Sequence, residues 1–230
     1  MIQKTKNLIN SILYKFGYRF SKINNTNELT KLYKYKNYSE YKNTQEYYNL
    51  KKIKHIWADS FNLKKIASFL NKNIKSKRLD GICHGTRNGF EQNHLMKLLK
   101  NSKIIGTDIS KSATKFENSF VWDFHKVNKK WKNKFDFLYS NSLDQSYNPK
   151  KALETWIDQI KINGYMIIEH SEQHGVIAAS KMDPFGVEAN FFPYLISEWF
   201  GHKISISVLK SHKPNKQNAP VWLFFIRKLK

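Results

Sequence analysis

From residue 79 to the end of the chain, short apolar runs alternate with longer segments that have helical spacing, and this alternation constrains the fold most. Buried strands are predicted at "RLDGICHG", "KIIGTDIS", "NSFVWDFHK", "KFDFLYSNSLDQ" and "YMIIEH". Helical segments lie between them, such as "NPKKALETWIDQIKI", which begins at Pro149 and is expected to stop at Asn163-Gly164. Such alternation produces a parallel sheet with helices on both faces. The closing runs "KISISVLK" and "VWLFFIRKL" add a strand pair. We therefore expect an α/β fold with a seven-stranded, mostly parallel sheet whose last strand is antiparallel.

The first 76 residues have a different pattern. Residues 1–22 predict a basic amphipathic helix, broken near Gly17, whose apolar side chains recur every three or four residues. This helix either packs on the domain or lies on an anionic membrane surface. Residues 23–55 alternate Lys, Asn and Tyr with little periodicity, so we expect a loosely structured connection, and then a helix near residues 57–70. The chain is thus divided into a helical extension, 1–76, and a domain, 77–230.

The formal net charge of +22 comes almost entirely from lysine. This charge either results from compositional bias and forms a solvated lysine surface, or it attracts an anionic partner such as nucleic acid, a membrane or a glycan. One cysteine cannot form an internal disulfide. The absence of a signal peptide or a long apolar run predicts a cytoplasmic protein, with peripheral contact to the inner membrane face through residues 1–22 as one alternative. The sequence fixes no oligomeric state.

The glycine-rich stretch "GICHGTRNGFE", residues 81–91, marks a candidate ligand site. It has neither the Lys of a phosphate-binding loop nor the spacing of a dinucleotide fingerprint, and Cys83, His84 and His94 lack the paired spacing of a metal site. We expect no metal. The stretch follows a strand at the carboxyl edge of the sheet, where α/β proteins bind ligands. Asp108 ends the second strand and Asp123 follows the third, where they could accept hydrogen bonds from a ribose and an adenine.

Taken together, "GICHGTRNG", "IIGTDIS", "WDFH" and "FLYSNSLDQSYNPKKALETWIDQIKINGYMIIEH" resemble the class I S-adenosylmethionine-dependent methyltransferases of small-molecule type, over residues 78–230. The resemblance implies a Rossmann-like fold, S-adenosylmethionine as cofactor, and a small-molecule or glycan acceptor. It implies a cofactor site made of Cys83, His84, Gly85, Thr86, Arg87, Gly89, Asp108, Ile109, Asp123, Phe124, Asn141 and Ser142.

The sequence departs from the family pattern in the glycine-rich loop and after the fourth strand. The family's opening acid is shifted to Asp80, and two of its glycines are replaced by Cys83 and Arg87. Arg87 could bind the carboxylate of the cofactor as a bidentate pair. Gln145 replaces a histidine that is common after the fourth strand.

A general base is needed only for a hydroxyl or a protonated amine as acceptor. Our first candidate is His170 at the end of the fifth strand, with His174 after it and Asp144 across the mouth of the site. A purely structural, hydrogen-bonded His170 is an equal alternative. The long connection 171–187 is expected to form a lid or a wall of the acceptor site.

The N-terminal "LINSILYKFGYRFSKI" is similar to the leading helices of bacterial methyltransferases of surface polysaccharides. That similarity predicts O-methylation of a sugar. The alternatives are an RNA methyltransferase that uses the basic surface, although the N-P-P-[YF] turn of many such enzymes is missing, and a fold that binds the cofactor without turnover.

Overall fold

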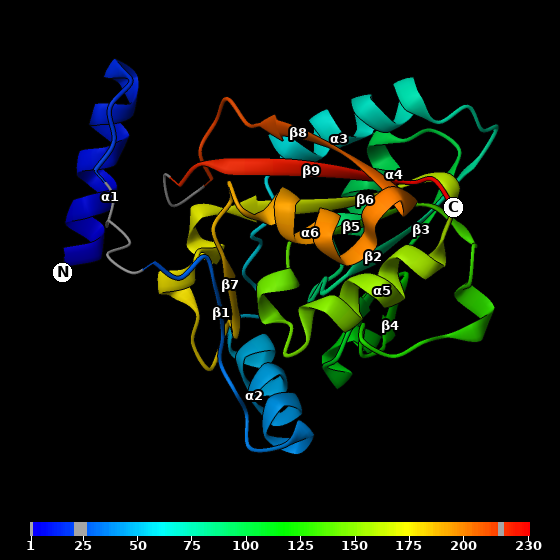
Figure 1. The fold of residues 1–230 in the computed structure, drawn as a ribbon, viewed down its shortest axis with the longest axis horizontal. Coiled ribbons are helices and arrows are strands. Elements are labelled where there is room, and N and C mark those ends of the chain that lie inside the picture. The colour runs from blue at the N-terminus through cyan, green and yellow to red at the C-terminus, as the bar shows by residue number, and fades with distance from the viewer. Residues whose placement is uncertain (1, 21–26, 216–218) are drawn as a thin grey trace.

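The chain folds around a twisted seven-stranded sheet with the strand order β4-β3-β2-β5-β6-β9-β8 (Figure 1). The computed structural model describes residues 2–20, 27–215 and 219–230. All strands are parallel except β9, which is antiparallel to both of its neighbours, so the predicted sheet is confirmed. Across the sheet the strands are β4 (Ser119–Val121), β3 (Ser102–Asp108), β2 (Leu79–His84), β5 (Phe135–Ser140), β6 (Ile160–Ser171), β9 (Val221–Lys228) and β8 (Ile204–Lys210).

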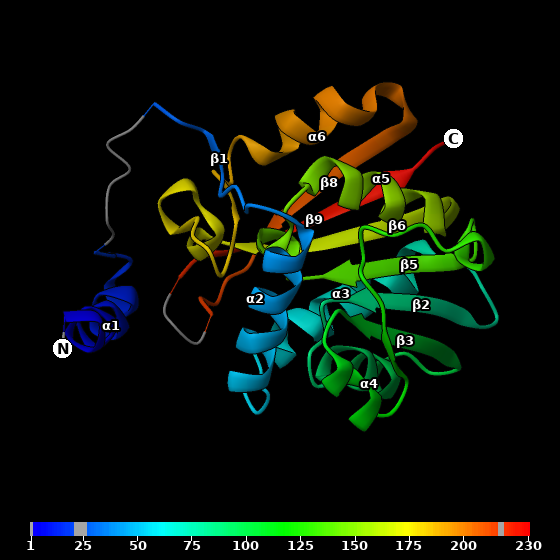
Figure 2. The same ribbon diagram turned by 90° about the horizontal axis from the view of Figure 1, so that it is seen from below.

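Helices cover both faces of the sheet, as Figure 2 shows from below. One hydrophobic cluster joins a face of the sheet to α3 and α4, and the other cluster joins the opposite face to α5 and α6. Successive strand residues such as Ile82 and Cys83 belong to different clusters, as the alternation of a buried strand requires. The bounds are α3 (Ser60–Asn73), α4 (Phe90–Leu98), α5 (Pro149–Gln159) and α6 (Phe192–Phe200).

Local signals set several helix boundaries. The side chain of Asn148 accepts a hydrogen bond from the backbone N–H of Lys151, and Pro149 takes the first helical position of α5. The fully buried Trp156 then anchors α5 on the sheet. The helix ends at Gln159, before the expected Asn163-Gly164 stop, because β6 already begins at Ile160.

The expectation of a loosely structured connection over residues 23–55 was wrong for its described part, since residues 27–55 contain α2 (Tyr38–Lys51) and the short strand β1 (Thr30–Leu32). Residues 23–26 lie outside the described residues. The strand β1 pairs with β7 (Phe185–Val187), inside the long connection that follows β6. In Figure 2, α2 lies across the carboxyl ends of the parallel strands. The N-terminal segment therefore covers the edge where a ligand was expected.

The helix α1 (Ile2–Leu13) lies apart from the rest of the protein in both views (Figures 1 and 2). Leu8 is 64% and Phe16 72% exposed, so the apolar side of this segment is not packed on the domain. Within the described ranges, no helix is both long and apolar enough to cross a bilayer. The division at residues 76 and 77 stays a prediction, and the structure adds that α3 shares the core of the sheet.

Candidate functional site

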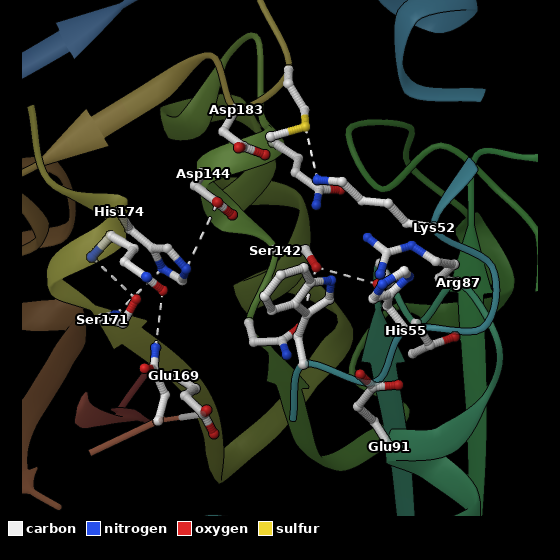
Figure 3. Close-up of a pocket in the computed structure, with 18 of the residues that line it drawn as sticks. Lys52, His55, Arg87, Glu91, Ser142, Asp144, Glu169, Ser171, His174 and Asp183 are labelled. Atoms are coloured by element: carbon white, nitrogen blue, oxygen red, sulfur yellow. Dashed lines mark hydrogen bonds and ion pairs between the residues drawn. The ribbon is translucent and has the colours of Figure 1, made fainter. Parts of the chain in front are cut away.

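A polar cavity of about 250 Å³ opens at the carboxyl edge of the sheet, between the loop after β2 and the loop after β5 (Figure 3). Its walls also include the residues that follow α2 and the connection after β6. Among the lining residues are Lys52, His55, Trp57, Gly85, Thr86, Arg87, Glu91, Asn141, Ser142, Asp144, Gln145, Glu169, Ser171, Gln173, His174, Met182 and Asp183.

The loop after β2 approaches the loop after β5 so closely that only glycine fits at residue 85. Gly85 has a φ of +74°, and an added Cβ would lie 2.5 Å from the Cβ of Ser142. The backbone N–H groups of Gly85 and Thr86 both donate to the carbonyl of Thr107, which fixes the turn against β3. These contacts hold the loop against the strand edge and leave Arg87 to form a wall of the cavity.

Arg87 is buried and has a φ of 44°, in the left-handed region that favours glycine. This explains why glycine is usual at that position in the family it resembles. Its backbone N–H donates to Oδ2 of Asp108 at 3.0 Å, and its Nε donates to Oδ1 of Asn49 at 3.3 Å. The guanidinium therefore lies beside the cavity, close to the predicted ribose acid.

Several predicted cofactor residues do not line this cavity. Cys83 is fully buried between the sheet, α3 and α4, and Phe124 packs in the opposite cluster. His84 is held between Thr107 and Gln159, and burial lowers its pKa to about 4. Gly89 at the start of α4 and Ile109 after β3 also lie outside the cavity lining, as do Asp108 and Asp123.

Asp108 ends β3 and Asp123 follows β4, but side chains of α2 bind both of these predicted adenosine acids. Asp108 accepts from Nδ2 of Asn49 at 2.7 Å, and Asp123 accepts from the hydroxyl of Tyr38 at 2.7 Å. Burial raises the pKa of Asp108 against the opposing effect of its hydrogen bonds. Burial also favours a higher pKa for Asp123, but the hydrogen bonds from His125 and Tyr38 have the larger combined effect and lower its pKa to about 2.

Carboxyl groups with raised pKa values gather in the cavity. Burial is the largest cause for each of them, and it raises the pKa of Asp144, Glu169 and Glu91 to about 7. Burial, together with the charge of Asp144, does the same for Asp183. Lys52 faces the same space, and burial lowers the pKa of its ammonium group. Near neutral pH, these carboxyls can therefore both take up and release a proton.

Of the three candidate bases, the structure brings two together and places the third elsewhere. Nε2 of His174 lies 3.7 Å from Oδ2 of Asp144, as the dashed line in Figure 3 marks. His174 is neutral at pH 7 because burial lowers its pKa to about 4, so the pair is not a salt bridge. His170 instead stacks on Phe192 and lines a second cavity of about 290 Å³ with Lys210 and Trp222.

The oxygen Oδ1 of Asp144 is buried and makes no hydrogen bond to any described residue. Native proteins rarely leave a buried carboxylate oxygen without a partner unless a ligand supplies one. The nitrogen Nδ1 of His174 accepts from the backbone N–H of Ser171 at 3.4 Å, so the neutral ring carries its proton on Nε2, toward Asp144. Asp144 shares this property with Glu91, whose Oε2 is also buried without a hydrogen bond to any described residue, so these two carboxyls of the cavity lack a partner.

The sequence patterns did not predict the cavity residues of the N-terminal segment, above all Lys52 and Trp57, nor the contact of Asn49 with Asp108. One signal was available, because Asn37 and Glu40 have the spacing of a capping box. The side chain of Asn37 accepts from the N–H of Glu40, and that of Glu40 accepts from the N–H of Lys36. Asp183 carried no signal beyond its place in the long connection.

Comparison with known proteins supports the fold and not a particular activity. No family model and no curated protein matches this sequence. Among solved structures, the chain is similar to 1,6-didemethyltoxoflavin-N1-methyltransferase of Burkholderia thailandensis, solved with its substrate and S-adenosylhomocysteine. The TM-score is 0.63 at 9% identity, over 86% of this chain and 93% of that one.

Two further structures give the same result. The N-methyltransferase NodS of Bradyrhizobium japonicum, in complex with S-adenosylhomocysteine, has a TM-score of 0.59 at 10% identity, over 81% of this chain and 100% of that one. The CurJ carbon methyltransferase has a TM-score of 0.58 at 11% identity; the match takes in 74% of this chain but only 54% of that one. The strand order, the antiparallel β9 and these similarities together show that the chain has the fold of the class I S-adenosylmethionine-dependent methyltransferases.

Proposed function

We propose that this protein transfers a methyl group from S-adenosylmethionine to a small-molecule acceptor. The observation that carries the proposal is the cavity between Gly85–Arg87 and Asn141–Asp144, at the carboxyl edge of a sheet with the methyltransferase strand order. Structures of similar fold were solved with S-adenosylhomocysteine, the product of that cofactor. When bound, the cofactor supplies an electrophilic methyl group.

The residues present fit this cofactor. Gly85 leaves space for a close approach of the backbone, and the Arg87 guanidinium can pair with a carboxylate at the open part of the cavity. Asp108 and Asp123 already accept hydrogen bonds from an amide and a hydroxyl, the kind of donors that a ribose and an adenine would offer. We assign these four residues to cofactor binding.

Asp144 is the residue that we propose as general base for a hydroxyl acceptor, in place of our first candidate, His170. Its Oδ1 is free of protein partners among the described residues, and its pKa of about 7 suits proton transfer at neutral pH. His174 would position the carboxyl from its other side through Nε2. We expect Asp144→Asn to lower turnover roughly 100- to 10,000-fold with little change in cofactor affinity.

The proposed acceptor is a sugar of a surface polysaccharide. Amide, hydroxyl and carboxyl groups dominate the far wall of the cavity, including Ser171, Gln173 and Asp183, and Trp57 adds an aromatic surface. Such a lining suits a polyhydroxylated molecule better than an apolar one. Release of S-adenosylhomocysteine with nucleoside diphosphate sugars or lipid-linked saccharides as probes would test this acceptor class.

Isothermal titration calorimetry with S-adenosylmethionine and S-adenosylhomocysteine tests the cofactor. We expect micromolar binding that Asp108→Ala weakens by at least tenfold, since the variant loses the carboxylate that binds the ribose. Glu154→Gln, which changes an exposed carboxylate on α5, is the matched control and should bind normally. Lack of binding at millimolar cofactor, or undiminished binding by Asp108→Ala, would overturn the proposal.

We also propose that residues 1–22 contact an anionic membrane surface. Leu8, Ile12 and Phe16 are exposed on a segment that also carries Lys15. Sedimentation with phosphatidylglycerol vesicles should retain the full chain, and Phe16→Asp should weaken retention, whereas Leu50→Asp on α2 should not. Equal retention on neutral phosphatidylcholine vesicles, or no effect of Phe16→Asp, would contradict this contact.

A further inference from the structure

The helix α2 presents two polar side chains to the two acids that the proposed cofactor needs. Asn49 is buried and donates from Nδ2 to Oδ1 of Asp108 at 2.7 Å. One helix length away, the hydroxyl of Tyr38 donates to Oδ2 of Asp123 at 2.7 Å. The same helix therefore binds the proposed ribose acid at its C-terminal end and the proposed adenine acid at its N-terminal end.

Every carboxylate oxygen of the two acids already accepts a hydrogen bond from the protein in this arrangement. Oδ1 of Asp108 also accepts from the N–H of Ser110 at 2.8 Å, and Oδ2 accepts from the N–H of Arg87 at 3.0 Å. Oδ1 of Asp123 accepts from the backbone N–H of His125 at 2.9 Å and contacts its Nδ1 at 2.7 Å. Asp108 and Asp123 are also absent from the lining of the cavity.

Aromatic groups of the same helix also pack beside Asp123, against His125 and Tyr147. Tyr41 is 2% exposed and lies with its ring centroid 5.7 Å from that of His125 and 4.6 Å from that of Tyr147. Tyr38 packs against both tyrosines as well. A nucleoside could reach the acids only if α2 moved away from the sheet.

A displacement of α2 would involve the connection after β6, because the two segments are tied together. Nε2 of Gln45 donates to the carbonyl of Met182 at 2.9 Å, and Nζ of Lys181 lies 2.7 Å from Oε1 of Glu40. The pairing of β1 with β7 joins the same two segments. Met182 and Asp183 line the cavity, so this connection is a wall of the proposed acceptor site.

We propose that Asn49 and Tyr38 are internal occupants of the adenosine subsite, and that the cofactor must displace α2 together with residues 181–183 to bind. The inference rests on the proposed function, since it concerns the cofactor of that site. The Asn49 amide takes the place of a ribose hydroxyl, and the Tyr38 hydroxyl takes the place of the adenine amino group. Cofactor binding and the position of the acceptor wall are thereby coupled.

The test is the double variant Tyr38→Phe, Asn49→Ala in the full chain, which keeps the ring at residue 38 and removes both hydrogen bonds. Each removed bond to a carboxylate should tighten S-adenosylhomocysteine binding by about tenfold, because the protein no longer competes for that acid. The matched control is Asn43→Ala, Tyr47→Phe, which changes the same residue types at exposed positions of α2 and should leave the affinity unchanged.

The outcomes separate this inference from the proposed function. If the wild type binds S-adenosylhomocysteine and the first variant binds it equally or more weakly, the inference alone is overturned. The two side chains would then not compete with the cofactor for the acids. Absence of S-adenosylhomocysteine binding by both proteins would overturn the proposed function and the inference together.

Hydrogen exchange without any ligand tests the coupling independently. The double variant should raise amide exchange in residues 38–51 and in residues 180–187 together. The hydrogen bond from Gln45 to Met182 and the ion pair of Lys181 with Glu40 join these two segments. The control variant should leave both segments protected. Faster exchange confined to α2 would refute a common movement.

Discussion

The buried carboxyl of Asp144 makes a prediction about stability that can be worked through in numbers. Its pKa rises from 3.8 to about 7 in the folded protein, mainly because of burial. A difference of one pKa unit corresponds to about 1.4 kcal/mol, so ionised Asp144 costs the folded state about 4 kcal/mol well above pH 7. Because the folded pKa lies above the unfolded one, this cost is absent in acid and grows as the pH rises from about 4 through about 7.

Asp144→Asn removes the ionisation while it keeps the shape of the side chain. Linkage predicts a gain over wild type of about 1.7 kcal/mol at pH 5 and about 4 kcal/mol at pH 8, a difference of about 2.5 kcal/mol. The negative charge of Asp144 also raises the pKa of Asp183, so the variant relieves that neighbour as well.

Urea unfolding at a series of pH values, followed by circular dichroism, measures this gain. Glu154→Gln is the matched control, because it also removes one carboxylate, from an exposed position on α5. A gain for Asp144→Asn that is the same at pH 5 and pH 8 would refute the reasoning. So would a variant less stable than wild type at pH 8, since Asp144 would then stabilise the fold as an anion.

Three further predictions concern the fold around the site. Gly85→Ala should lose clearly more than the roughly 1–2 kcal/mol that a left-handed alanine costs alone, because its Cβ would also lie 2.5 Å from the Cβ of Ser142. A loss of about 1 kcal/mol or less in thermal unfolding would contradict this. His84→Gln should reduce the loss of stability in acid. The folded pKa of His84, about 4, lies below the ordinary 6.5, so the wild type loses up to about 3 kcal/mol of unfolding free energy as the pH falls from 6.5 to 4. The same loss in the variant would contradict this. Trp156→Leu should cost about 3 kcal/mol or more, since the indole is fully buried and donates to the carbonyl of Phe124, and a cost below about 1 kcal/mol would place the residue outside the core.

The elements that were predicted correctly are those whose inward side chains are apolar. Leu153 and Trp156 recur on one side of α5 and are fully buried there, so hydrophobic spacing identified the helix. The inward side of α2 has the same helical spacing, but it consists of Tyr41, Thr44, Gln45 and Asn49. Hydropathy carries no signal for a buried polar surface, which is why this helix was missed.

The positions of Asp108 and Asp123 at the edge of the sheet could be predicted because strand ends are set by the sheet, whereas the side chain of β6 that faces the cavity could not. Along β6, neighbouring side chains point to opposite faces: Glu169 accepts from the hydroxyl of Tyr139 and lines the principal cavity, and His170 stacks on Phe192 on the other side. The period-two alternation of a strand predicts that Glu169 and His170 point to opposite faces of the sheet, but it does not predict which of them faces the cavity. His174 reaches it only because the chain turns after Ser171.

The pairing of β1 with β7 also has a consequence for biosynthesis. The ribosome makes β1 and α2 early, but the partners of these segments, β7 and the carbonyl of Met182, emerge late. The strand β1 must therefore stay unpaired until β6 and the connection after it have been synthesised, because long-range contacts form only once both partners exist. A truncated chain that ends before residue 180 should therefore keep the bonds of α2 to Asp108 and Asp123, but leave residues 30–32 without a partner strand and open to proteases.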